Sequence, residues 1–131
     1  MSEPDWSAAL ADPEVIRSVL GSPPPPLTDH RLESLLVDER GSSVTLRLSA
    51  FAVAAGAAEL WRERGHNAYE FVLVCGGVSD FVVDAWSGWP LTEAVLEAGA
   101  VTLTGRDRRV SFRAEAIRAE PPVGRLWGRT P

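Results

Sequence analysis

Residues 43–50 alternate strictly between apolar and polar side chains. In an extended chain successive side chains point to opposite faces, so this segment has one apolar face and one polar face. The two sets are Val44, Leu46, Leu48 and Ala50 against Ser43, Thr45, Arg47 and Ser49. The pattern predicts a half-buried strand of an antiparallel sheet that keeps one face in contact with water.

Other segments of this length repeat the signal and are separated by polar or glycine-containing connections, which favour hairpins. We predict three antiparallel pairs, namely residues 32–37 with 43–50, residues 69–75 with 81–86 around Gly76-Gly77, and residues 100–104 with 109–117. The predicted fold is therefore mostly β (α+β). Its sheet is an antiparallel meander of about six strands, either open or curled into a half-barrel, with one short N-terminal helix.

A short helix is predicted over residues 13–20, ahead of the sheet. Asp12 is suited to the N-cap, Pro13 to the first helical position, and Gly21 to the end of the helix. The apolar side chains of the helix share one face, so we expect it to pack on the sheet together with Trp6 and Leu10. The proline run at residues 23–26 predicts a stiff extended spacer.

The length of 131 residues is typical of one domain. We therefore predict a single domain over 1–131, with the helix at 13–20 and the antiparallel β body at 31–117. Residues 118–131 contain Pro121-Pro122 and Gly124, and this composition predicts a loose tail.

Cysteine content and hydropathy indicate the compartment. The single cysteine, Cys75, cannot form an intramolecular disulfide, and residues 1–5 have neither the basic start nor the apolar run of a signal peptide. No apolar stretch approaches the roughly 18–20 residues that cross a bilayer. We expect a cytoplasmic protein with no membrane partner.

The net charge of −5 is unevenly distributed. Residues 1–105 carry 6 arginines against 15 acidic residues, and residues 106–131 carry 7 against 3. An acidic surface over most of the chain disfavours nucleic acid as a partner. The arginines near residues 106–109 form a smaller basic alternative, although no aromatic residues are interleaved with them.

The sequence contains no arrangement typical of catalysis, metal binding or cofactor binding. His30 and His66 are far apart and have no ligand-spaced partners, and Cys75 ends an apolar strand, where an inert buried thiol is common. Nucleophile-elbow, Walker and dinucleotide-binding motifs are missing from the sequence. Asp80 and Asp84 are spaced to share a strand face, as hydrolase acids can, but a solvated face explains them equally well. We predict no enzyme activity, no metal and no cofactor.

Five tryptophans are unusual in a chain of this size, and two of them, Trp86 and Trp89, follow a predicted strand. Tryptophan beside acidic residues is a good anchor for a protein partner. Alternatively, Trp61, Trp86 and Trp89 close the end of the sheet core. The sequence is compatible with both roles.

Several spaced positions together resemble one known family. They are Trp6, residues 26–29 leading into Leu32, the strand at 44–48, Trp61, Asn67, and residues 78–81 running to Trp86. Over residues 6–117 this pattern resembles the immunity protein 50 family of bacterial polymorphic toxin systems. The resemblance implies a mostly β protein that protects the producing cell by binding a cognate toxin, without a cofactor.

Because nuclease toxins that act on nucleic acid are often basic, an acidic face would suit such a partner. The predicted toxin-binding patch consists of Glu59, Glu63, Asp80, Asp84, Trp86 and Trp89. Two alternatives stay open: a small β-rich structural or regulatory interaction domain, and an enzyme or carrier with a pocket lined by Tyr69, Trp86 and Cys75. The sequence carries no signal for or against self-association.

Overall fold

Strand β2 (Ser43–Ala50) is the strand that the alternation predicts. Val44, Leu46 and Leu48 are fully buried, and Arg47 is exposed. The computed structural model describes residues 5–50, 65, 67–84, 89–97, 99–106 and 108–125, with the backbone alone at 89 and 90. In it β2 pairs with β1 (Arg31–Asp38) on one edge and with β3 (Ala68–Gly76) on the other.

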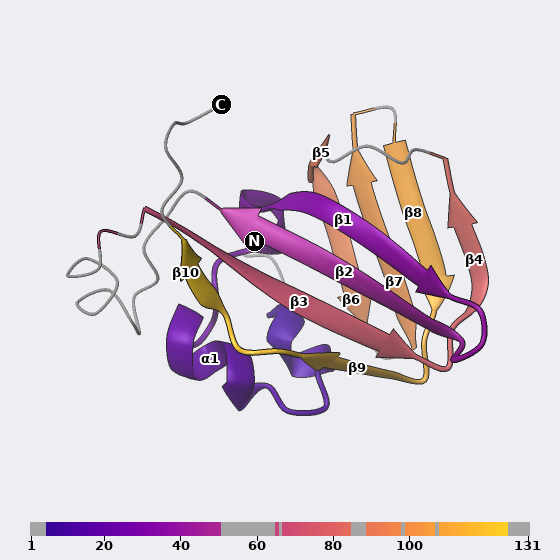
Figure 1. The fold of residues 1–131 in the computed structure, drawn as a ribbon, viewed down its shortest axis with the longest axis horizontal. Helices are drawn as coiled ribbons and strands as arrows, with labels where there is room; N and C mark the ends of the chain where they lie inside the picture. Colours follow the sequence, from indigo (N-terminus) through magenta and orange to yellow (C-terminus); the bar gives the residue numbers. More distant parts are fainter. Residues whose placement is uncertain are drawn as a thin grey trace.

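Two antiparallel sheets account for the strands of the described residues. Sheet A has the order β10-β3-β2-β1-β5, with β9 also paired to β3, and sheet B has the order β4-β8-β7-β6. The remaining bounds are β4 (Ser79–Val83), β5 (Trp89–Pro90), β6 (Glu93–Glu97), β7 (Ala100–Gly105), β8 (Arg108–Arg113), β9 (Ala116–Ala119) and β10 (Val123–Arg125). Figure 1 shows sheet A in front of sheet B, with the strands of the two sheets crossing. The mostly β, antiparallel class is confirmed, but the strands form two sheets that do not close into a barrel.

The first and third predicted hairpins are confirmed, because β1 pairs with β2 and β7 pairs with β8. The hairpin around Gly76-Gly77 is wrong, since β3 lies in sheet A and β4 pairs with β8 in sheet B. Both edges of β3 are already occupied, by β2 on one side and by β9 and β10 on the other. The chain therefore crosses between the sheets at Gly77, whose φ of +63° favours glycine and whose added Cβ would lie 2.6 Å from the Glu115 side chain.

The last predicted strand, 109–117, is divided between the sheets. β8 ends at Arg113 and β9 begins at Ala116 in sheet A, beside the Gly77 crossover, where the Glu115 N–H donates to the Gly76 carbonyl at 2.9 Å. The loose tail predicted from residue 118 is wrong up to residue 125, because β9 continues to Ala119 and β10 pairs with residues 68–70 of β3. Residues 126–131 lie outside the described residues.

The helix predicted over 13–20 is confirmed as α1 (Glu14–Leu20), although Pro13 takes the N-cap in place of Asp12 and makes no side-chain cap hydrogen bond. It is preceded by the 3-10 turn η1 (Trp6–Ala9) and followed by η2 (Leu27–Asp29). We call residues 5–30 the N-terminal segment. Figure 1 shows α1 near β9 and β10, and η1 and η2 contact β6 of sheet B.

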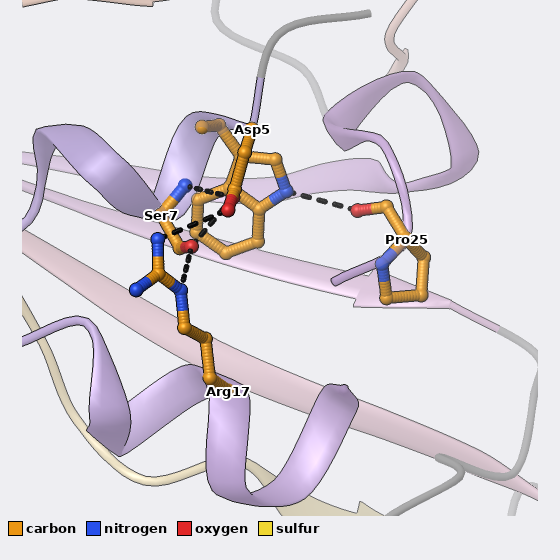
Figure 2. A network of polar contacts seen from close by, with 5 residues as sticks. Asp5, Ser7, Arg17 and Pro25 are labelled. Atoms are coloured by element: carbon orange, nitrogen blue, oxygen red, sulfur yellow. Dashed lines mark hydrogen bonds and ion pairs between the residues drawn. The ribbon is translucent and has the colours of Figure 1, made fainter. Parts of the chain in front are cut away.

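The N-terminal segment is fixed by aromatic stacking and by a polar network. The Trp6 ring stacks on Phe71 of β3 with centroids 5.4 Å apart, and its indole Nε1 donates to the Pro25 carbonyl at 2.9 Å. Arg17 of α1 donates to Ser7 Oγ at 2.8 Å and forms a 3.0 Å ion pair with Asp5 (Figure 2). Side chains from this segment and from both sheets then form one buried cluster, which includes Trp6, Leu10, Ile16, Leu20, Leu27, Leu46, Phe71, Leu103 and Phe112.

Candidate functional site

Two of the predicted toxin-contacting acids are exposed at β4, an edge strand of sheet B: Asp80 lies within the strand and Asp84 directly follows its end. The register of β4 against β8 shifts between Ser79 and Val82, and Asp80 lies inside this bulge with a φ of +54°. Aspartate tolerates that left-handed conformation better than most residues. The bulge interrupts the strict alternation that would place the two acids on one face.

Asp84 has a structural contact of its own. Its Oδ1 accepts a 3.0 Å hydrogen bond from the Arg109 N–H, and its own N–H donates to the Arg109 carbonyl at 3.1 Å. These bonds continue the pairing of β4 with β8 by one residue. One carboxylate oxygen of Asp84 is thus hydrogen-bonded at the end of β4, whereas Asp80 is exposed within the bulge.

The other four residues of the predicted patch cannot be joined to these acids. Glu59, Glu63 and Trp86 lie outside the described residues. Trp89 begins β5 and pairs with Leu32 of β1 through its backbone, and its side chain is outside the description. The choice between core and interface for Trp61, Trp86 and Trp89 therefore stays a prediction.

A groove lies on the open side between the two sheets, where the end of β1 faces β4. It encloses about 710 Å³ and its described lining is Leu36, Val37, Asp38, Glu39, Arg40 and Phe81; we call it the β1–β4 groove. Leu36 is 65% exposed and Val37 is 38% exposed, and both line the groove together with Phe81. The groove thus combines exposed apolar surface with two carboxylates and one guanidinium.

The strand at 32–37 was predicted from the sequence, but Leu36 and Val37 were not among the predicted functional residues. The available signal was the unbroken apolar run Leu35-Leu36-Val37, which departs from the alternation of the neighbouring strand. In the structure Val37 faces the same side as buried Val44, and Leu36 pairs with Thr45 and faces outward. A run of this kind exposes at least one apolar side chain when only one face of the sheet is covered.

Tyr69, which one alternative placed at a pocket, forms a buried pair with His30. His30 Nδ1 lies 2.9 Å from the Pro26 carbonyl, which can only accept, so Nδ1 carries the proton and Nε2 accepts from the Tyr69 hydroxyl at 2.7 Å. Burial lowers the pKa of His30 and raises the pKa of Tyr69. Both groups are neutral near pH 7 and hold η2 against β3.

Cys75 is completely buried in β3, and burial raises the pKa of its thiol to about 12. A thiol in this state is a poor nucleophile at neutral pH. A second hollow, of about 400 Å³, lies beside the Gly77 crossover and is lined among the described residues by Ser42, Gly77, Val78, Ser79, Gly99, Arg113, Ala114 and Glu115. Neither hollow has Tyr69 or Cys75 in its described lining.

Over the described ranges, no three His, Cys, Asp or Glu side chains are grouped as a metal site would require. His66 lies outside those ranges. No helix in the described part of the chain has the length and apolar character needed to cross a membrane.

Comparison with known proteins identifies the family. The model of the family described as immunity protein 50 matches residues 12–121. This chain belongs to the immunity protein 50 family. Searches of curated proteins and of solved structures returned no match.

The match confirms the resemblance found in the sequence and shifts its limits from 6–117 to 12–121. It spans α1 and all strands from β1 to β9, so both strands beside the β1–β4 groove belong to the part shared with other immunity proteins of this family. Membership in an immunity protein family points to a non-enzymatic role and, in general terms, to a toxin as partner.

Proposed function

We propose that this protein is the immunity protein of a bacterial polymorphic toxin system and that it neutralises a cognate toxin by direct protein–protein contact in the cytoplasm of the producing cell. The observation that carries the proposal is the family match over residues 12–121. A protective inhibitor of this kind acts by occupying the toxin surface, so it needs no cofactor and no reaction of its own.

The reactive side chains of the core support a binding role. Cys75 is buried with a raised thiol pKa, and the His30 imidazole is engaged on both nitrogens, by the Pro26 carbonyl and the Tyr69 hydroxyl. Groups of this kind serve catalysis when they face a substrate cavity and each other. Here the His30–Tyr69 hydrogen bond holds η2 against β3, and Cys75 is buried in the core of sheet A.

The charge of the protein favours a basic toxin. The net charge is −5, and opposite net charges accelerate the encounter of two proteins. A stable complex needs an interface of about 800 Å² on each partner, with a few apolar or aromatic anchors near its centre. The patch proposed from the sequence, Glu59, Glu63, Asp80, Asp84, Trp86 and Trp89, provides both acids and aromatic side chains.

The test is co-expression with the product of the neighbouring gene. If that product is the toxin, its expression alone stops growth, co-expression of this protein restores growth, and the two proteins co-purify at a fixed ratio. A toxic neighbour whose effect persists and which does not bind would contradict the proposal. A neighbour that binds without being toxic would favour the alternative of a regulatory interaction domain.

A further inference from the structure

We propose that the toxin docks in the β1–β4 groove by adding an extended segment to the free edge of β1, and that this segment alternates apolar residues with Lys or Arg. The inference rests on the proposed function and specifies the surface and the partner chemistry. It places the contact mainly on β1, a strand that the patch predicted from the sequence does not include.

One edge of β1 can accept a further strand. Among the described residues, β1 pairs with β2 along its length, but its other edge pairs with β5 only at Arg31 and Leu32. The edge at residues 34–38 therefore presents backbone donors and acceptors to a further strand. Extended segments of partner proteins bind such edges through main-chain hydrogen bonds.

Apolar side chains lie beside that edge. Val37 faces the interior side of sheet A, Leu36 faces the outer side, and Phe81 of β4 lies across the groove. Phe81 is half-buried, with its ring 6.0 Å from that of Phe112. Alternate residues of an added strand would cover Val37 and Phe81 with one face and reach Leu36 with the other, which matches an alternating sequence.

The charge of the groove selects the occupant. Asp38 and Glu39 line the groove, Asp80 adjoins Phe81 in the chain, and Arg40 is the cation among the described lining residues. A second copy of this chain would bring the same acids against this rim, whereas a basic segment would neutralise them. A toxin segment carrying Lys or Arg therefore fits the groove better than self-association does.

The groove is held in place before binding. The Asp38 carboxylate accepts hydrogen bonds from the Arg40 and Gly41 N–H groups at 3.0 and 3.3 Å, which shapes the β1–β2 turn. The Val78 N–H donates to the Ser42 carbonyl at 2.8 Å and ties this turn to the crossover that leads into β4. A site already fixed in the free protein loses less conformational entropy on binding.

The decisive experiment measures binding of the purified product of the neighbouring gene to Leu36→Glu and to a matched control, Val95→Glu. Val95 is 44% exposed on β6, the sheet B edge strand away from β4, so both variants place the same acid at an exposed edge position. We expect Leu36→Glu to weaken binding at least about tenfold and Val95→Glu to change it less than about threefold. Circular dichroism and the melting temperature establish that both variants fold.

A second pair of variants tests the role of charge without altering the apolar surface. This pair keeps the proposal testable if Leu36→Glu does not fold. Glu39→Lys reverses a charge in the groove, and Glu93→Lys reverses a charge at an exposed position of β6. We expect slower association for Glu39→Lys and an unchanged rate for Glu93→Lys. The difference should shrink as the salt concentration rises from about 0.05 M to about 0.5 M.

Hydrogen–deuterium exchange tests the strand addition directly. On toxin binding we expect slower exchange of amides at residues 34–38 and unchanged exchange at residues 94–96 of β6.

If wild type binds the toxin and both members of each variant pair bind equally well, the groove proposal is wrong while the proposed function stands. If wild type does not bind, the proposed function itself fails. A free protein that is a dimer, and that Leu36→Glu converts to a monomer, would assign the groove to a second copy and overturn the proposal.

Discussion

The two open sides of this two-sheet structure are treated differently. The side bounded by β6 is covered by the N-terminal segment, which buries Trp6, Ile16 and Leu27. On the side bounded by β4 and the end of β1, Leu36 is 65% exposed in a groove. On the first side the apolar side chains of the N-terminal segment are buried in the core, whereas on the second side Leu36 and Val37 are exposed. This difference can be tested by substituting residues on each side in turn and measuring stability.

The largest expected effect is on the covered side. Trp6→Ala removes the stacking on Phe71 and the hydrogen bond to the Pro25 carbonyl, and should lower the free energy of unfolding by about 3–5 kcal/mol. Leu36→Ala should change it by less than about 0.5 kcal/mol, because that side chain is already in water. Urea unfolding of both variants measures the contrast. Equal losses would show that Leu36 belongs to the core.

Tyr69→Phe should have a smaller effect on the same side. The substitution removes the hydroxyl that donates to His30 Nε2 and leaves a buried acceptor unsatisfied, which costs about 1–3 kcal/mol. Phe71→Leu is the comparison, because Phe71 is fully buried on the same strand and has no polar group. Its loss of stability measures the effect of packing alone. A Tyr69→Phe protein as stable as wild type would show that the hydroxyl is dispensable.

Arg17→Ala should cost less again. It removes the bonds to Ser7 and Asp5 that fix α1 to η1, and these groups are partly exposed, so we expect a loss of about 1 kcal/mol. Arg31→Ala, in a longer 3.5 Å ion pair with Glu33, is the control and should change stability by less than about 0.5 kcal/mol. A thermal melt that ranks the two variants in the opposite order would contradict the role given to the network in Figure 2.

The smallest effect expected is a pH dependence from His30. Burial lowers its folded-state pKa below the ordinary 6.5, so between these two values the unfolded state binds more protons than the folded state. The stability associated with neutral His30 is therefore full above 6.5 and declines as the pH falls below it. Unfolding measured at about pH 7.5 and about pH 5.5 should show this decline in wild type and a smaller one in His30→Gln. The same decline in both proteins would assign it to other groups.

Local patterns predicted the parts of the fold that depend on neighbouring residues in the chain. The alternation in β2 and the polar turn at residues 38–41 were sufficient for the first hairpin, and the helix was found from its apolar face and Gly21. The Gly76-Gly77 hairpin failed because the partners of β3 are decided by strands far along the chain. β9 and β10 occupy the edge that β4 would have needed.

The candidate site was predicted only in part for the same reason. Asp80 and Asp84 were identified as exposed acids, but their relation depends on a bulge that appears when β4 pairs with β8. The exposure of Leu36 depends on the partners that the edge of β1 has in space. Composition and periodicity describe one strand at a time, so the sequence gives no sign, beyond the run Leu35-Leu36-Val37, that the described residues leave most of one β1 edge unpaired.

Strand β3 is paired on both edges, and this has a consequence for folding during synthesis. Its first edge is available to β2 early, but its second edge is closed by β9 and β10, from residues 116–125. Until these residues have been synthesised, the second edge of β3 in the nascent chain has no strand partner. The side chains of β3 that the folded protein buries are then still exposed. The nascent chain can therefore complete sheet A only after residues 116–125 have emerged from the ribosome.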